Sequence, residues 1–269
     1  MRLEFWGVRG TMPVAGKHKI KYGGNTICSA VYAEDNSPII IDAGTGIKKL
    51  GDEIVRTKGD KPINLSILLT HFHLDHIQGL PFFAPLYLPD AILTIYSPQS
   101  PKETEQYLSG LMAGRYFPVD FWGTPSMKLY LQIQGDFSLK GVHISMCPLH
   151  HPQGSVAYRL TTDKKSVVFA TDTEHPANGI DKNLAEFAEG ASDFIYDATY
   201  TINEYESGKV GWGHSTWLEG TKLAKAAKVN HLHLSHFNPD HSDKQIDEIV
   251  AKAQEKFPQT SGAKESFPD

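Results

Sequence analysis

Cysteine is scarce in this chain, and its scarcity excludes a disulfide framework. Among 269 residues only Cys28 and Cys147 occur, each inside an apolar, strand-like stretch. Small secreted domains that depend on disulfides carry many more cysteines. We therefore expect two buried thiols in a reducing compartment.

Long apolar runs and long basic runs are also missing. The opening MRLEFW lacks the apolar stretch of a secretory signal, and no run approaches the length that spans a bilayer. The formal net charge is −5, and no block of Lys and Arg provides a dedicated grip on duplex DNA or on an RNA backbone. We expect a cytoplasmic protein without a membrane contact and without a nucleic-acid-binding arm.

The chain has the length and apolar content of one domain. With 269 residues, 40% of them hydrophobic, it can bury a single sizeable core. Strand-like and helix-like stretches alternate, which predicts an α/β fold in one domain over residues 1–257. The segment 258–269, rich in Ser, Gly, Pro and charge, is predicted to be a poorly ordered tail.

Hydrophobic periodicity and turn residues place the individual elements. Predicted strands cover about residues 3–8, 27–33, 38–42, 65–70, 91–96, 128–133, 142–148, 156–161, 166–171, 193–196 and 231–235. Predicted helices cover about residues 47–57, 101–113, 182–189, 216–228 and 243–256.

Three histidines and an aspartate crowd together directly after the apolar stretch 65–69; they are His71, His73, Asp75 and His76. Imidazole nitrogens and carboxylate oxygens are donors that Zn²⁺ takes in proteins. Residues two apart on an extended segment share a face, so His71 and His73 can bind one metal while Asp75 and His76, past a bend, reach a second. Burying so much polarity without a metal would be costly, so the cluster predicts a metal site.

Further donors stand at the ends of other predicted strands. His150 and His151 follow the stretch 142–149, Asp172 follows 167–171, and His236 follows 231–235. A rigid scaffold presents functional groups to a loop-lined cleft at such places. A carboxylate such as Asp172 can bridge two cations, which an imidazole nitrogen does not do readily. The pattern predicts a site for two divalent metal ions.

The blocks around these residues resemble those of the metallo-β-lactamase-fold hydrolases. Residues 71–76 match the family's His-x-His-x-Asp-His hallmark in full, and the blocks 39–46, 151–158, 170–174 and 234–241 match in the expected order. The segments 7–10, 22–26 and 211–216 resemble the phosphodiesterase branch, which holds the phosphoribosyl cyclic phosphodiesterases, the tRNA 3′-end nucleases and the class II cyclic-nucleotide phosphodiesterases. Ala157 is a departure, because the third block usually has glycine there.

The resemblance implies a four-layer αββα sandwich of two mixed sheets flanked by helices. It also implies two metal ions per chain, which we expect to be zinc, with manganese or iron as alternatives. One metal would be held by His71, His73 and His151, the other by Asp75, His76 and His236, with Asp172 between them. Adjacent strand residues point to opposite faces, and the seven-residue spacing to Tyr158 selects His151 rather than His150 as the ligand.

Two residues outside the ligand set are assigned roles. His214 lies in a Gly- and Trp-rich loop before a predicted helix N-cap, and the resemblance places it at the rim of the site. There it would join Asp75 among the catalytic residues, stabilising phosphoryl charge or protonating the leaving oxygen. Asp42 is expected to orient a ligand histidine.

Aromatic side chains are dense in the irregular segment 80–135. Tyr116, Phe117 and Trp122 are expected to line a substrate pocket, because such rings stack on a base or sugar. The same rings would also suit an apolar subunit contact or the core. We expect a homodimer.

Together these features predict a dinuclear metal-dependent phosphodiesterase that cleaves a small cyclic phosphate or nucleotide by attack of a metal-bridging hydroxide. An endoribonuclease of the tRNA 3′-processing type shares the same blocks, but that function needs an RNA-gripping arm. A non-hydrolytic metal-binding protein on the same fold is a third possibility, against which the hydrolase-like ligand pattern argues.

Overall fold

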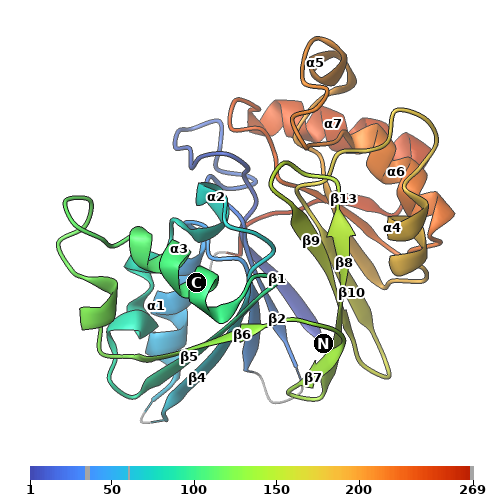
Figure 1. Cartoon of the computed structure of the whole chain (residues 1–269). Helices are drawn as coiled ribbons and strands as arrows, with labels where there is room; N and C mark the ends of the chain where they lie inside the picture. Colours follow the sequence, from blue (N-terminus) through green and yellow to red (C-terminus); the bar gives the residue numbers. More distant parts are fainter. Residues whose placement is uncertain (34–36, 60, 267–269) are drawn as a thin grey trace. The chain divides into compact units, whose positions relative to one another are not determined.

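The structure is a computed structural model that describes residues 1–33, 37–59 and 61–266. The chain forms two compact units, each built around one mixed sheet (Figure 1). The N-terminal unit comprises residues 2–7, 25–134 and the described residues from 265 onward. The C-terminal unit comprises residue 1 and residues 8–24 and 135–264.

The N-terminal unit contains a six-stranded sheet in the order β1-β2-β3-β4-β5-β6. Strands β1 to β3 pair antiparallel, and β3 to β6 pair parallel. The strands are β1 (Arg2–Gly7), β2 (Cys28–Tyr32), β3 (Pro38–Ile41), β4 (Ile63–Leu68), β5 (Ala91–Ser97) and β6 (Met127–Gln132).

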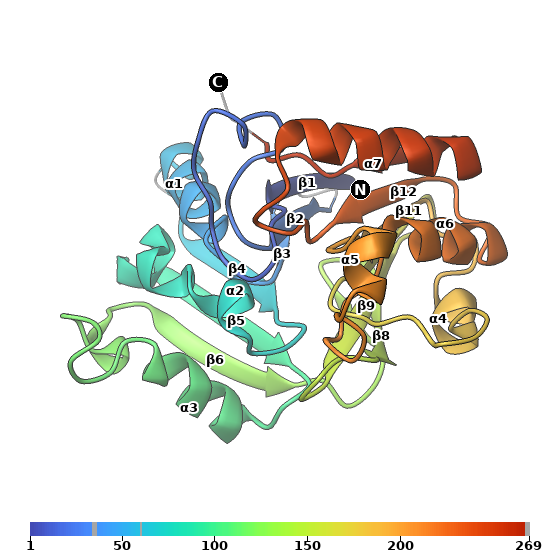
Figure 2. The same ribbon diagram turned by 90° about the horizontal axis from the view of Figure 1, so that it is seen from above.

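Helices of the N-terminal unit pack against this sheet, α1 on β1 and α3 on β6 (Figure 2). Helix α1 buries Ile47 and Leu50, and Gly51 lies so close to the Phe83 ring that a Cβ atom there would be 2.6 Å from it. Helix α3 begins at a capping box formed by Ser100 and Glu103. The helices are α1 (Ile47–Thr57), α2 (Leu74–Ile77) and α3 (Pro101–Gly110), with 3₁₀ turns η1 (Leu80–Phe82), η2 (Ala84–Tyr87) and η3 (Phe121–Gly123).

The C-terminal unit contains a seven-stranded sheet in the order β13-β12-β11-β10-β9-β8-β7. Strands β10 to β13 pair parallel, and β7 to β10 pair antiparallel. The strands are β7 (Phe137–Leu139), β8 (Val142–Leu149), β9 (Ser155–Thr161), β10 (Ser166–Ala170), β11 (Asp193–Asp197), β12 (Leu232–Ser235) and β13 (Thr260–Gly262).

Four helices belong to the C-terminal unit. Helix α6 packs on β11 and β12, α7 packs on β13, and the two helices contact each other. The helices are α4 (Lys182–Phe187), α5 (Ile202–Glu206), α6 (Trp217–Ala226) and α7 (Asp243–Lys256). Among the described residues, no helix is both long enough and apolar enough to cross a bilayer.

The predicted α/β class, with two mixed sheets and flanking helices, is confirmed. Every predicted strand and helix has a counterpart, whereas β7, β13, α2 and α5 were not predicted. The chain divides into two compact units, and the single domain over residues 1–257 stays a prediction.

Two expectations were wrong. Residues 260–262 of the predicted disordered tail form β13, because their backbone pairs in parallel with β12, and Glu265 is buried with hydrogen bonds to Asn25. Residues 267–269 of that tail lie outside the described residues. Cys28 is buried, and burial raises the pKa of its thiol, but Cys147 is only half-buried because it lies on a partly exposed stretch of β8.

Candidate metal centre and active site

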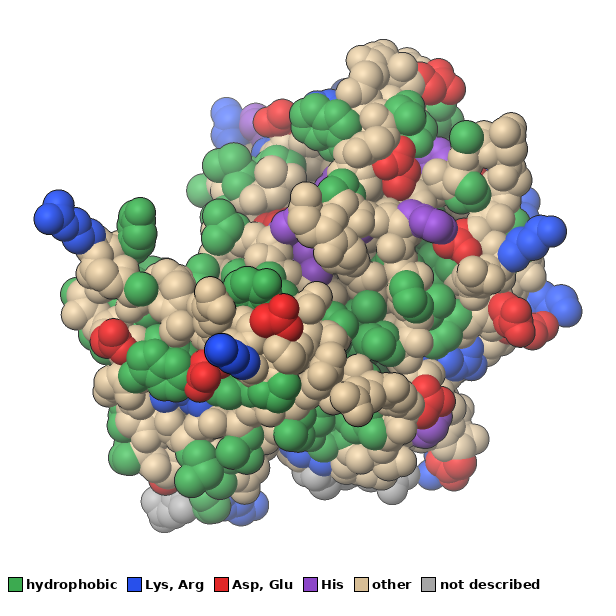
Figure 3. Space-filling view, viewed as in Figure 1, with side chains coloured by type: hydrophobic (Ala, Val, Ile, Leu, Met, Phe, Trp, Pro, Cys, Tyr) green, Lys and Arg blue, Asp and Glu red, His purple; other side chains and the backbone are tan. Residues whose placement is uncertain are grey.

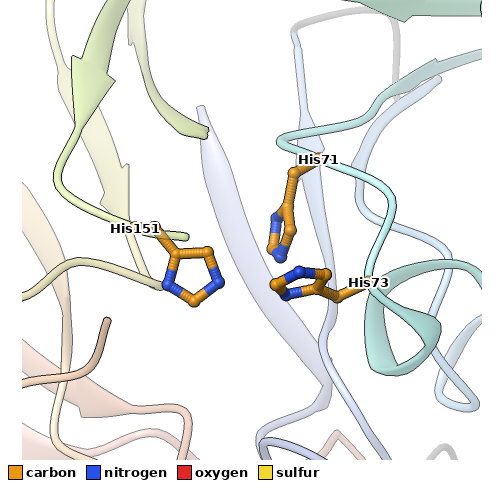
Figure 4. A group of neighbouring side chains, drawn as sticks. All are labelled: His71, His73 and His151. Atoms are coloured by element: carbon orange, nitrogen blue, oxygen red, sulfur yellow. The ribbon is translucent and has the colours of Figure 1, made fainter. Parts of the chain in front are cut away.

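The histidine cluster of the N-terminal unit lies on the segment that follows β4. His71 and His76 are buried and His73 is half-buried. The ring centroid of His71 lies 4.5 Å from that of His73 and 4.3 Å from that of His76. Asp75 and His76 belong to the single turn α2, where Asp75 Oδ2 is 3.7 Å from His76 Nε2. Four donors are thus gathered on one short segment, two of which, His71 and His73, are drawn in Figure 4.

Asp42 fixes the ring orientation of two of these histidines. Its Oδ2 is 2.8 Å from His76 Nδ1 and accepts the hydroxyl hydrogen of Thr70 at 2.9 Å. The Thr70 hydroxyl has one hydrogen, so towards His71 it acts as the acceptor, with its oxygen 3.0 Å from Nδ1. With Nδ1 protonated in both rings, Nε2 carries the lone pair that can bind a metal.

Asp172 is the centre of the donor set in the C-terminal unit. Its Oδ1 lies 3.2 Å from Nε2 of His236 and 3.8 Å from Nε2 of His151. All three side chains are almost completely buried. A buried carboxylate oxygen and two imidazole nitrogens therefore face one another.

Hydrogen bonds also select the tautomer of these two histidines. His151, which follows β8 and is drawn in Figure 4, donates from Nδ1 to the carbonyl oxygen of Gly213 at 2.7 Å. The Thr199 hydroxyl gives its hydrogen to Asp197 at 2.8 Å, so its oxygen accepts from Nδ1 of His236 at 2.9 Å. Both rings then direct an Nε2 lone pair at the Asp172 carboxylate. Such electron-rich atoms repel unless a proton or a cation lies between them, so these residues fit a divalent metal.

The backbone is strained at three of these positions. Asp42, Asp172 and His236 have positive φ values of 61°, 61° and 58°. Each lies just beyond the end of a strand: β3, β10 and β12. The left-handed conformation is uncommon for residues other than glycine, although aspartate and histidine adopt it more often than most, and such backbone concentrates at functional sites.

His150 and His151 have different surroundings. The His151 side chain is buried, whereas that of His150 is 69% exposed and lies 3.6 Å from Asp181. This is the opposite-face arrangement expected for neighbouring residues, and the ligand role of His151 stays a prediction.

Asp197, which the sequence analysis missed, organises the donor set of the C-terminal unit. Its two oxygens accept hydrogen bonds from the backbone and side chains of five neighbouring groups: Asp172 N, Thr199 N, Thr199 Oγ1, His214 Nδ1 and Ser215 N. Burial opposes its ionisation, but attraction to His214 and the hydrogen bond from that ring outweigh burial and lower the pKa of the carboxyl. These hydrogen bonds hold the Asp197 carboxylate and the groups that donate to it in one orientation. Its position at the end of β11 was the signal that could have identified it.

His214 lies inside this network. Its Nδ1 donates to Asp197 Oδ2 at 2.9 Å and is 3.9 Å from Asp172 Oδ1. Its ring stacks on that of His236, with centroids 4.8 Å apart and planes at 21°. Asp172, Asp197, His214 and His236 bring donor atoms within 4.8 Å of one another. With Nδ1 held by Asp197, Nε2 of His214 is the atom that can exchange a proton.

The segment 7–10 supports the loop that carries His236. Gly10 packs so closely that a Cβ atom there would lie 2.2 Å from the His236 ring. Arg9 is fully buried and donates to the backbone oxygens of Gly23, Asn238 and His241 at 2.9, 3.1 and 2.7 Å. These contacts explain why a glycine stands at position 10 and an arginine at position 9, although both are far from His236 in the sequence.

The aromatic residues assigned to the pocket belong to the N-terminal unit. Tyr116 is 89% exposed and Trp122 is 55% exposed, so neither is a core residue. Phe117 is partly buried and packs edge-on against Phe82 with centroids 5.6 Å apart. Their role toward a substrate stays a prediction.

Comparison with known proteins gives a family match and several relatives. A family model described as "Beta-lactamase superfamily domain" matches residues 38–237. Ribonuclease Z of Brevibacillus brevis is 35% identical over 100 residues, which cover 36% of this chain and only 30% of that protein. Exodeoxyribonuclease WalJ of Streptococcus pneumoniae is 22% identical over 244 residues, which cover 86% of this chain and 84% of that protein.

A solved structure agrees with this match at the level of the fold. The metallo-β-lactamase fold protein YhfI from Bacillus subtilis has a TM-score of 0.71 and 19% identity, covering 98% of this chain and 97% of that one.

Proposed function

Because the chain belongs to the Beta-lactamase superfamily, we propose that it is a metal-dependent hydrolase that cleaves a small cyclic phosphate or a nucleotide phosphodiester. The ribonuclease and exodeoxyribonuclease among its relatives are named for the cleavage of phosphodiesters, which supports this substrate class. The proposal rests most directly on one observation: Asp197 fixes His214 next to Asp172 and His236.

Two divalent cations, zinc or alternatively manganese or iron, are part of the proposal. His71, His73 and His151 would hold one, and Asp75, His76 and His236 would hold the other, with Asp172 shared between them. The support is the chemistry of the donors: the hydrogen bonds to Asp42, Thr70, Thr199 and Gly213 leave Nε2 as the donor atom in four of the histidines. When bound, such cations lower the pKa of water and neutralise charge on phosphoryl oxygens.

Other residues of the chain would orient the imidazole rings and supply a proton. Asp42, Asp197 and Thr199 hold imidazole rings in one orientation, so no reorganisation is needed when substrate binds. His214, protonated at both nitrogens, would donate its Nε2 hydrogen to the leaving oxygen as the P–O bond breaks. The Asp197 carboxylate, 2.9 Å from Nδ1, would hold the ring in place and stabilise positive charge on it in this role.

The aromatic segment and the oligomeric state belong to the same proposal. Tyr116, Phe117 and Trp122 would flank part of the substrate, and the exposure of Tyr116 and Trp122 is compatible with this role. The homodimer expected from the sequence also stays a prediction.

A panel of substrates tests the proposed function. Protein reconstituted with zinc, manganese or iron is assayed on 2′,3′- and 3′,5′-cyclic nucleotides, ribose cyclic phosphates, precursor tRNA and a β-lactam. We expect phosphodiester hydrolysis that Asp172→Asn abolishes, because asparagine keeps the shape but removes the charge of the shared ligand. His143→Ala, at an exposed histidine of the same unit, is the matched control and should retain activity. Turnover of the β-lactam alone, or an active Asp172→Asn protein, would refute the proposal.

Processing of precursor tRNA is the second candidate. It is favoured by the 35% identity to ribonuclease Z over 100 residues. Cleavage of precursor tRNA at least as efficient as that of the small diesters would select it.

A further inference from the structure

An open cleft of about 600 Å³ lies in the C-terminal unit, beside the proposed site. Three segments wall it: the end of β8 with His150 and Pro152, the segment after β10 with Glu174 and His175, and the loop 205–213 with Tyr205 and Val210. His151 and Gly213 also line it, and Gly213 directly precedes His214. A group bound in this cleft would therefore be a neighbour of the residues proposed to carry out the reaction.

The loop wall of the cleft is fastened by Glu174. One carboxylate oxygen accepts the Tyr205 hydroxyl and the backbone N–H of Gly211, each at 2.7 Å, and the other accepts the N–H of Gly213 at 2.8 Å. Gly208, Gly211 and Gly213 have positive φ values of 120°, 84° and 82°, so the loop follows a path that suits glycine. The wall is therefore anchored before any ligand arrives.

The lining is apolar and aromatic. The rings of His175 and Tyr205 lie 4.4 Å apart, with planes inclined at 45°, and Val210 is 65% exposed. Among the described residues that line the cleft, none is Lys or Arg. Lys209, next to Val210, lies over the ring of Trp212 at 3.7 Å. Figure 3 shows histidine and hydrophobic side chains, together with some acidic ones, on the face below the place that α5 occupies in Figure 1.

This chemistry suits an uncharged, flat group and not a chain of phosphates. Phosphates are bound by Lys, Arg or clustered N–H donors, whereas the acidic group here is Glu174, whose oxygens already accept three hydrogen bonds. Flat rings stack on aromatic side chains and fill apolar pockets.

We propose that this cleft binds the base of a nucleoside phosphodiester, an inference that rests on the proposed function. The preferred substrate is then a base-bearing small diester. A ribose cyclic phosphate without a base leaves the cleft empty, and an extended RNA backbone finds no cation in its lining.

Blocking the cleft from its exposed wall tests this assignment. Ala177 lines the cleft and is exposed, so tryptophan at this position can occupy the space without disturbing the core. Asn178, the next residue, is exposed and does not line the cleft, so Asn178→Trp is the matched control. We expect Ala177→Trp to raise KM for 2′,3′-cyclic AMP about tenfold, since stacking of one base contributes about that factor or more. The KM of Ala177→Trp for ribose cyclic phosphate should stay unchanged, and so should the KM of Asn178→Trp for both substrates.

A binding measurement separates this inference from the proposed function. Adenosine, which has no phosphate, is titrated into chelator-treated protein and followed by Trp fluorescence or NMR. Saturable binding that Ala177→Trp removes and Asn178→Trp retains supports the cleft assignment even if no diester in the panel is hydrolysed. Two outcomes for an Ala177→Trp protein with a native unfolding midpoint overturn the cleft assignment. One is normal binding of adenosine; the other is an equal loss of activity on 2′,3′-cyclic AMP and on ribose cyclic phosphate.

Discussion

At the scale of a single side chain, His214 is the residue that the proposed function assigns to the leaving group. Its Nδ1 is held by Asp197 and its ring face is covered by His236. The hydrogen bond and the ring contact fix the position of the imidazole and leave Nε2 as the nitrogen that the proposal uses as proton donor.

Replacing His214 by alanine should lower kcat on poorly activated diesters by about 10²–10⁴-fold, the usual contribution of a general acid. A nitrophenyl diester should lose much less, because nitrophenolate leaves without a proton. The measurement is kcat for both substrates at fixed metal content. Equal losses on the two would assign His214 to charge stabilisation, and loss of a metal equivalent would make it a ligand.

At this scale, the sequence was most informative where one short segment carries the signal. His71 to His76 could be identified because four donors fall within six residues, and Asp42 because it ends a strand before them. Asp197, Glu174 and Arg9 act through partners distant in sequence, such as His214, Gly213 and His241. Only Asp197 carries a local signal, its position at the end of β11; no local pattern distinguishes Glu174 and Arg9 from ordinary charged residues of a folded chain.

Among the elements, the parallel edge formed by β12 and β13 is the clearest departure from expectation. Ser261 on β13 lies 2.9 Å from His231 Nε2 and 3.1 Å from His233 Nδ1, and His233 Nε2 lies 2.8 Å from Asp193. A short strand made of Thr, Ser and Gly has no apolar alternation, so the sequence pattern could not reveal it. Its stability comes from the β12 ladder and from this side-chain network.

His231 should make the stability of this edge depend on pH. Burial, followed by repulsion from His233, lowers its pKa below the ordinary value of 6.5. The unfolded chain therefore takes up a proton at a pH where the folded chain does not, and stability falls as the pH drops through about 6.5. We expect the urea midpoint of the metal-free protein to fall between pH 7.5 and pH 5.5, and His231→Gln to reduce that fall.

The control for this experiment is His143→Gln, which removes one histidine from an exposed position of the same unit. An identical pH dependence in His231→Gln and in the unsubstituted protein would contradict the assignment.

For the whole molecule, metal binding should be a large part of the stability. A ligand that binds only the folded state at about a hundred times its Kd adds about 2.7 kcal/mol. For chains of this size, each kcal/mol corresponds to about 2–4 °C in Tm. Removing metal with a chelator should therefore lower Tm by roughly 5–10 °C in calorimetry.

Metal identity provides the control. Excess zinc should restore Tm, whereas magnesium, which prefers oxygen ligands and octahedral geometry, should not. A Tm that is indifferent to chelation would contradict the proposed ligand set.

The class of the whole fold was accessible from sequence because long periodic segments dominate it. Strands such as β3 and β10 are continuous buried apolar runs, and helices such as α7 begin at a clear cap. The family resemblance drawn from the five ligand and turn blocks is confirmed by the match over residues 38–237. The short elements α2, α5 and β7 carry too few residues for periodicity to appear, and their existence depends on tertiary contacts.

Asp42, Asp172 and His236 have a left-handed backbone, which glycine would adopt more easily than the residues that the proposed function needs there. Glycine adopts this conformation more freely than aspartate or histidine, so glycine would relax these three strand ends while removing a carboxylate or an imidazole. The donor atoms that the proposed function needs at these three places would therefore be kept at a cost in folding stability.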